Sequence, residues 1–100
     1  MGAGLIERYD VYRVDGILLV VLQSEMLDID TVVVAPLVPR AEAIQSRKIT
    51  PPIVFEDVEY LLLVQALAAQ PKRTLRQRIG HVGEMHDDVS NALDMIFKGF

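Results

Sequence analysis

The sequence predicts an α+β fold, mostly β, in which a small, curled antiparallel sheet or barrel of short strands precedes one C-terminal α-helix. Short β-branched and apolar runs, separated by turn signals, fill residues 5–80. The last segment changes to helical periodicity. A length of 100 residues and a hydrophobic content of 51% suit a single domain with a small core, which we expect to span residues 1–100.

The first three strands are predicted from runs at 5–13, 17–23 and 31–37. The first run, LIERYDVYR, alternates loosely, and Asp15-Gly16 after it is a typical hairpin turn. The second run, ILLVVLQ, is almost wholly apolar, which predicts a central strand that is buried on both faces. In the third run, TVVVAPL, Pro36 predicts that the strand ends at an edge or a bulge.

The middle of the chain predicts a long excursion and a second hairpin. Residues 38–52 hold three of the five prolines, and we expect an irregular path there with a short helical turn at 40–46. PIVFE and EYLLLV, within residues 52–64, are expected to pair through a turn at Glu56-Asp57-Val58. The segment 60–70 fits strand and helix equally well.

A sixth strand is predicted at residues 72–80, with Leu75, Gln77 and Ile79 on one face. Four of the ten basic residues lie in this segment: Lys72, Arg73, Arg76 and Arg78. Such a strip is typical of a solvated strand edge, and it would also suit an acidic or nucleic-acid partner. Because the net charge is −4, we expect no direct nucleic-acid binding except through partners.

A C-terminal helix is predicted at residues 86–97. Its apolar residues recur at three- and four-residue steps: they are Val89, Ala92, Leu93, Ile96 and Phe97. Asp87 and Asp88 fall near its start, where the helix dipole favours negative charge. We expect one face of the helix to pack on the sheet.

Composition excludes several classes of function. A chain without cysteine has no disulfide, no thiolate nucleophile and no cysteine-based metal site. The longest apolar runs, at 17–22 and 60–69, are shorter than the roughly 20 residues that cross a membrane. Glu7 and Arg8 stand where a signal peptide would be apolar. We therefore expect a cytoplasmic protein that does not bind membranes.

No cluster of residues specifies a metal or cofactor site. His81 and His86 are separated by five positions, which is too far for a metal-binding pair on one helix face. Glu84 and Asp87 add carboxylates nearby, but such residues are typical caps and dipole partners at the start of a helix. We therefore expect no metal and no cofactor.

The search for catalytic residues leaves one alternative open. The serines lack the context of a catalytic nucleophile. An arginine of the 72–78 strip, together with Asp10 or Glu56, could support RNA cleavage as in small barrel ribonucleases. No complete set of catalytic residues is recognisable, so we expect a protein that is not an enzyme.

Two segments combine apolar and polar residues as recognition sites do. QSEMLD at 23–28 follows the central strand, and DMIFKGF ends the sequence. Phe97 is either the last core residue of its helix or part of a recognition surface. Phe100 follows Gly99, which can end a helix in a left-handed cap, so Phe100 has no helical neighbour. We expect Phe100 to lie at an interface.

The order of four motifs resembles the CcdB family, the toxins of plasmid and chromosomal toxin–antitoxin modules. The motifs are LIERYDVYR, LQSEMLD, VVVAPL and NALDMIFKGF. The resemblance implies an SH3-like barrel of the CcdB/MazF type with a C-terminal helix, assembled as a homodimer. It implies a toxin without catalysis of its own that binds the DNA gyrase A subunit and traps gyrase on cleaved DNA. It also implies a CcdA-like antitoxin whose disordered segment wraps and neutralises the toxin.

The resemblance further assigns the gyrase-binding residues. They are Met26, Leu27, Asp94, Phe97, Lys98, Gly99 and Phe100. Lys98 stands where the family has a tryptophan that stacks on a gyrase arginine, and Asp94 stands where a neutral amide is usual. Two alternatives to a gyrase toxin are open: a degenerate or retargeted homologue that binds antitoxin but does not poison gyrase, and a MazF-like endoribonuclease.

Overall fold

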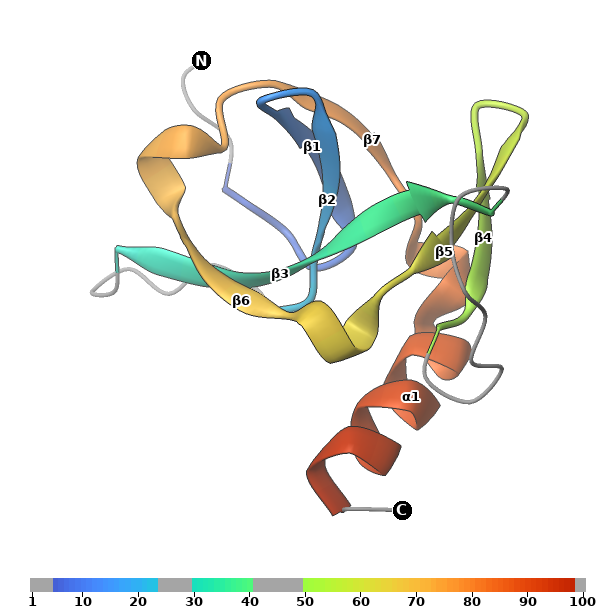
Figure 1. Ribbon diagram of the computed structural model, residues 1–100. Helices are drawn as coiled ribbons and strands as arrows, with labels where there is room; N and C mark the ends of the chain where they lie inside the picture. Colours follow the sequence, from blue (N-terminus) through green and yellow to red (C-terminus); the bar gives the residue numbers. More distant parts are fainter. Residues whose placement is uncertain (1–4, 24–29, 41–49, 99–100) are drawn as a thin grey trace.

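The computed structural model describes residues 5–23, 30–40 and 50–98. These residues contain seven strands and one α-helix (Figure 1). The strands are β1 (Asp10–Val14), β2 (Ile17–Val21), β3 (Thr31–Pro39), β4 (Pro52–Phe55), β5 (Val58–Leu62), β6 (Ala68–Pro71) and β7 (Arg78–His81). The helix is α1 (His86–Lys98), and short 3-10 helices occur at η2 (Val64–Ala66), η3 (Lys72–Thr74) and η4 (Gly83–Met85). The predicted C-terminal helix is thereby confirmed.

The strands form one antiparallel sheet that curls into a half-barrel. Their order is β4-β5-β3-β2-β1-β7, and β6 pairs with β3 outside this path. α1 lies at one end of the half-barrel, beside the end of β5 and below β7 (Figure 1). The predicted fold class, α+β and mostly β with one C-terminal helix, is confirmed.

Two tight hairpins follow from the residues at their turns. Asp15 and Gly16 connect β1 to β2 with φ angles of 52° and 81°. Glu56 and Asp57 connect β4 to β5 with φ angles of 51° and 65°. Two consecutive positive φ angles are typical of the type I′ turn, whose twist matches that of the flanking strands. The first turn was predicted correctly, whereas Val58 belongs to β5 and not to the second turn.

β3 is the longest strand and is shared by three neighbours. Along one side it pairs with β2, and along the other it pairs first with β6 and then with β5. Pro36 lies where the second side changes partner, and its carbonyl accepts a hydrogen bond from Leu63 N–H at 2.9 Å. Proline has no N–H group to donate, and position 36 lies between the residues of β3 that pair with β6 and those that pair with β5. The missing donor therefore breaks neither pairing. The prediction that the strand ends near Pro36 is wrong, because β3 continues to Pro39.

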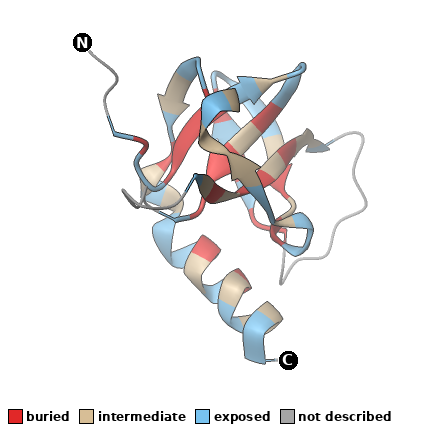
Figure 2. Ribbon diagram, turned by 90° about the vertical axis from the view of Figure 1, so that its left-hand side faces the viewer, coloured by how far each residue is buried: buried red, intermediate tan, exposed pale blue. Residues whose placement is uncertain are grey.

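Two hydrophobic cores lie on opposite faces of the middle strands. The larger contains Val20 and Leu62, and the smaller contains Val21 and Val34. Val20 and Val21 are adjacent in β2, so their side chains point to opposite faces, and both are completely buried. The prediction of a central strand is confirmed, but burial on both faces holds only for the end of β2, because Ile17 at its start is 52% exposed. Figure 2 shows the buried residues concentrated inside the half-barrel and few of them on the helix.

The two outer strands of the path approach each other through a phenylalanine and a glycine. A Cβ atom on Gly80 of β7 would lie 2.7 Å from Cζ of Phe55 of β4, and closer still to Cε1. Phe55 is buried and belongs to the larger core. The ring therefore fills the space that any other residue at position 80 would need. Side-chain packing, and not strand pairing, connects these two edges in the described part of the chain.

Two strand predictions require correction at their boundaries. The first strand begins at Asp10 and not at residue 5, because Tyr9 adopts a φ of 71° in a turn. The predicted strand 72–80 is mostly wrong: η3 occupies its beginning and only β7 is extended. Leu75 is buried in the smaller core while Gln77 is exposed, so the predicted shared face does not exist.

The ambiguous segment 60–70 turns out to contain three elements. It ends β5, passes through η2 and enters β6. Local preference does not distinguish strand from helix here, and the pairing of Ala68 and Ala69 with β3 selects the strand. The helical turn predicted at 40–46 lies outside the described residues except for Arg40, which is helical.

Candidate functional site

The C-terminal half of α1 extends away from the sheet (Figures 1 and 2). The buried residues of α1 are Val89 and Ala92. Leu93 and Ile96 are partly buried and pack against the larger core. These positions form one stripe at helical spacing. Phe97 lies outside the stripe and is 73% exposed. The interpretation of Phe97 as the last core residue is therefore wrong, and its side chain is available to a partner.

Three of the predicted gyrase-binding residues share one exposed face of α1. Asp94, Phe97 and Lys98 are separated by three and four positions, so they are neighbours on the helix surface. All three are exposed. The Phe97 ring thus has an acidic residue one turn before it and a basic residue next to it. The remaining predicted residues lie outside the described part of the chain: Met26, Leu27, Gly99 and Phe100.

A second group of polar residues surrounds a buried carboxylate at the start of β1. Asp10 is 1% exposed. Its Oδ1 accepts from Arg78 Nε at 2.9 Å and contacts His81 Nδ1 at 3.0 Å. Its Oδ2 accepts from the backbone N–H of Glu7 at 3.0 Å. The carboxylate therefore joins β1 to β7 and fixes two side chains of β7.

A β-bulge explains how Arg78 and His81 reach the same oxygen. Asp10 is opposite His81 and Tyr12 is opposite Arg78, so β7 has one extra residue, Ile79, between these pairs. In a regular strand, positions 78 and 81 would point to opposite faces. The extra residue restores them to one face, which is a common effect of bulges. The local alternation of the sequence gave no sign of this arrangement.

The ion pair changes the acidity of both partners. Burial on its own raises the pKa of Asp10, but hydrogen bonds from Glu7 N–H, His81 and Arg78 outweigh burial and hold the pKa below its ordinary value of 3.8. The hydrogen bond to Asp10 is the largest cause that raises the pKa of Arg78. Asp10 is therefore ionised at neutral pH.

The structure supports one requirement of the ribonuclease alternative and argues against another. The structure does bring Arg78 and Asp10 together, as that alternative requires. Because Asp10 is buried and both its oxygens accept hydrogen bonds, it cannot exchange a proton with an outside substrate. Glu56, the other predicted acid, lies in the turn between β4 and β5.

The two histidines occupy separate hydrogen-bonded positions. Tyr9 Oη lies 2.6 Å from His86 Nδ1, and the two rings meet edge to face. Cζ of Arg8 lies over the Tyr9 ring, 5.3 Å from its centroid, and Arg8 donates through Nε to Leu22 O. No group of three or more metal-ligating side chains occurs among the residues that the structure describes.

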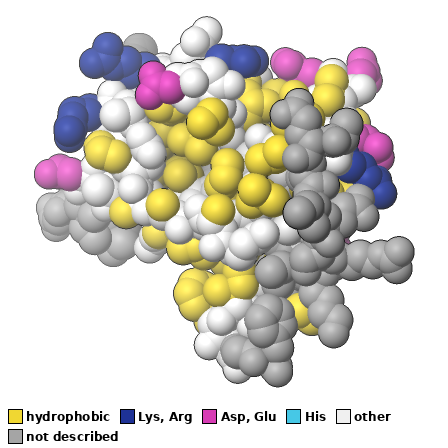
Figure 3. All heavy atoms as spheres, viewed as in Figure 1, with side chains coloured by type: hydrophobic (Ala, Val, Ile, Leu, Met, Phe, Trp, Pro, Cys, Tyr) yellow, Lys and Arg dark blue, Asp and Glu magenta, His cyan; other side chains and the backbone are white. Residues whose placement is uncertain are grey.

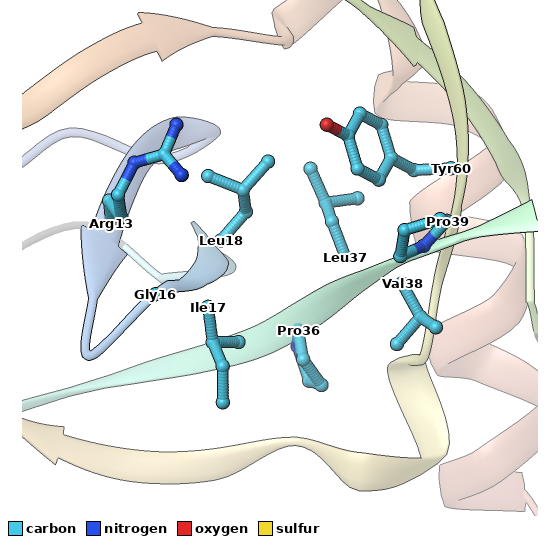
Figure 4. A pocket seen from close by; sticks show the side chains of 9 residues that line it. All are labelled: Arg13, Gly16, Ile17, Leu18, Pro36, Leu37, Val38, Pro39 and Tyr60. Carbon is cyan, nitrogen blue, oxygen red and sulfur yellow. The ribbon is translucent and has the colours of Figure 1, made fainter. Parts of the chain in front are cut away.

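An apolar groove of about 470 Å³ lies beside β2, β3 and β5 (Figure 4). Leu18 of β2, Leu37 of β3 and Tyr60 of β5 line it, and Ile17 stands at one rim with 52% of its surface exposed. Among the described lining residues, Arg13 is the one that carries a charge. Figure 3 shows apolar side chains gathered on this side of the sheet. The groove is a hydrophobic surface suited to another protein.

Comparison with known proteins identifies the family. A model of the CcdB protein family matches residues 8–99 of the 100-residue chain. No curated protein matches significantly. Within the described residues, α1 is too short and too polar to cross a membrane. The matched range includes Asp10, Arg78 and His81, the groove and all of α1. The chain therefore belongs to the CcdB family, whose members are toxins of toxin–antitoxin modules.

Proposed function

We propose that this protein inhibits DNA gyrase by binding its A subunit through the exposed end of α1. The observation that supports this most is Phe97, a large aromatic side chain that is 73% exposed in the last turn of α1. Aromatic residues at the centre of protein interfaces often supply most of the binding energy. Asp94 and Lys98 flank the ring and would fix the orientation of the partner.

Lys98 determines how strongly a basic partner can bind. It occupies the last turn of α1 and is exposed, so its ammonium group is solvated and free to approach a partner. A partner that offers arginine to this position meets repulsion where an aromatic ring would have provided cation–π attraction. Lys98→Trp should therefore strengthen binding to the gyrase A subunit by roughly thirtyfold, equivalent to about 2 kcal/mol.

The experiment compares four chains for binding to a gyrase A fragment. They are the wild type, Lys98→Trp, Phe97→Ser and Val54→Ser. Val54 is a matched control because it is also an exposed apolar residue, with 61% of its surface accessible, but it lies on β4. Phe97→Ser should weaken binding by about thirtyfold or more, and Val54→Ser should not change it. Equal losses in the two serine variants would contradict a site on α1.

A plasmid assay separates gyrase poisoning from the alternatives. With gyrase and supercoiled plasmid, the wild type should give linear DNA and should leave RNA intact. Cleavage of RNA by the protein alone would favour the endoribonuclease instead. Antitoxin binding without any effect on gyrase would indicate the degenerate or retargeted homologue. The burial of Asp10 supports the non-enzymatic interpretation.

We further propose that the toxin acts as a homodimer in the cytoplasm and is neutralised by a CcdA-like antitoxin. An exposed apolar groove beside Ile17 supports association with another protein surface. A disordered antitoxin segment can cover such a surface by folding as it binds. Light scattering measures the assembly of the free protein; a monomer at all concentrations would contradict the homodimer.

A further inference from the structure

We propose that Arg78 and His81 form a binding site for a phosphate group, carried by a nucleotide or by the backbone of a nucleic acid. Both side chains are anchored through their inner nitrogens, Nε and Nδ1, to the same oxygen of Asp10. The terminal nitrogens of Arg78 and Nε2 of His81 are not used in these bonds. The two side chains are 53% and 42% exposed, so part of each is accessible to a ligand.

The site is organised by its surroundings before any ligand arrives. The bulge at Ile79 places Arg78 and His81 on one face of β7, and the buried carboxylate restricts both rotamers. Asp10 itself follows Tyr9, whose φ of 71° is an uncommon conformation for a residue with a side chain. Strained backbone of this kind concentrates at binding sites because the surrounding structure must hold it.

His81 packs closely against Gly83. A Cβ atom on Gly83 would lie 2.6 Å from Nε2 of His81. The imidazole therefore occupies the space that a side chain at position 83 would need, and this contact helps to fix the orientation of the ring.

A phosphate group matches these donors better than a carboxylate does. The guanidinium fork gives two parallel N–H groups, and the imidazole gives a third donor when it is protonated. A tetrahedral phosphate has enough oxygens to accept from both side chains at once. The negative charge of Asp10 offsets one positive charge of the site. A ligand must therefore accept hydrogen bonds from the two side chains, because charge attraction alone is weakened.

Glu7 offers a second way to test the proposal, because its negative charge would repel a bound anion. It is exposed, and its charge contributes to the raised pKa of Arg78. Removing that charge should strengthen the attraction of the site for phosphate without touching the proposed donors. Arg76 is the matched control for Arg78, because it belongs to the same basic strip but bonds to Arg73 O instead of Asp10.

The test is NMR titration of the histidine side chains with inorganic phosphate, at constant ionic strength maintained with chloride. His86 serves as the internal reference, since its Nδ1 is already held by Tyr9. Phosphate should shift the His81 signals in a saturable way and leave His86 nearly unchanged. Arg78→Gln should weaken this binding about tenfold or more, whereas Glu7→Gln should strengthen it about twofold.

Further titrations identify the source of the phosphate. A nucleoside monophosphate, a DNA duplex and a single-stranded RNA are compared, and binding that depends on Arg78 in the two polymers indicates a backbone site. Equal shifts of His81 by phosphate and chloride would overturn the proposal. So would equal losses in Arg78→Gln and Arg76→Gln, which would show a diffuse charge effect. Thermal melts establish that each variant is folded. If Arg78→Gln does not fold, the effect of Glu7→Gln on phosphate affinity still tests the proposal.

Discussion

Replacement of Gly80 by alanine should destabilise the fold by about 1–3 kcal/mol. The new Cβ would lie 2.7 Å from Cζ of Phe55, whereas carbon atoms in favourable contact are roughly 3.5–4.0 Å apart. Phe55 is buried in the larger core, so its ring cannot turn into solvent without losing that burial. Gly80 does not have a positive φ, so alanine is acceptable to the backbone itself. The expected cost therefore comes from the contact between the two edge strands.

Urea denaturation at one fixed protein concentration measures this cost in four chains: the wild type, Gly80→Ala, Phe55→Leu and the double variant. A fixed concentration is needed because association stabilises the folded state. Phe55→Leu alone should cost about 1–2 kcal/mol, since it leaves a partial cavity. With leucine at 55, the alanine at 80 has room, so the two costs should not add and the coupling should reach about 1 kcal/mol.

Two results would refute this explanation of the half-barrel. The first is a Gly80→Ala variant within about 0.5 kcal/mol of the wild type, which is the range of neutral surface substitutions. The second is an alanine cost that is the same with phenylalanine and with leucine at position 55. Either result would mean that β4 and β7 are not connected by this contact.

Three further predictions concern the buried carboxylate, the second hairpin and the groove. Because folding lowers the pKa of Asp10, its carboxylate stabilises the fold above the ordinary value of 3.8, and this contribution is lost as the pH falls through the lower value of the folded state. Asp10→Asn should lower the free energy of unfolding by about 2 kcal/mol at neutral pH, and this difference from the wild type should narrow in acid; a constant difference would refute this. Exchange of Glu56-Asp57 for Asn-Gly should raise stability by about 1 kcal/mol in thermal melts, because both positions have positive φ. Ile17→Glu at the groove rim should shift the proposed homodimer toward monomer in light scattering, while Val54→Glu, at a similarly exposed position on β4, should not.

The functional residues show how far sequence patterns reach. The spacing of apolar residues predicted α1 and its packed face, but it also placed Phe97 on that face. Ile96 still packs partly against the larger core, but Phe97 lies beyond the edge of the packed stripe and its side chain is exposed. Periodicity reports the direction of a side chain along the helix, and the extent of the neighbouring surface decides whether the side chain is buried.

The Asp10 cluster could not be found from local patterns. The sequence offered Asp10 or Glu56 as an acid that could act with an arginine of residues 72–78 in RNA cleavage, but it predicted no buried ion pair and gave His81 no role beside Asp10. Asp10 and His81 are separated by 71 positions, and the antiparallel pairing of β1 with β7 brings them together. The extra residue in β7 then determines which side chains reach the carboxylate. A bulge is a property of two paired strands, so one strand's alternation does not reveal it.

The sequence by itself determined the fold class, the hairpin turn at Asp15-Gly16, the central position of β2 and the C-terminal helix. These features depend on turn chemistry and on the periods of apolar residues, which are local properties of the chain. Only the tertiary structure decided that residues 68–71 form a strand, that β3 divides its pairing at Pro36, and that Gly80 receives the ring of Phe55. Each of these features depends on a partner that is distant in sequence. Such a contact stabilises the chain only after the sheet has formed and curled, so local patterns do not reveal it.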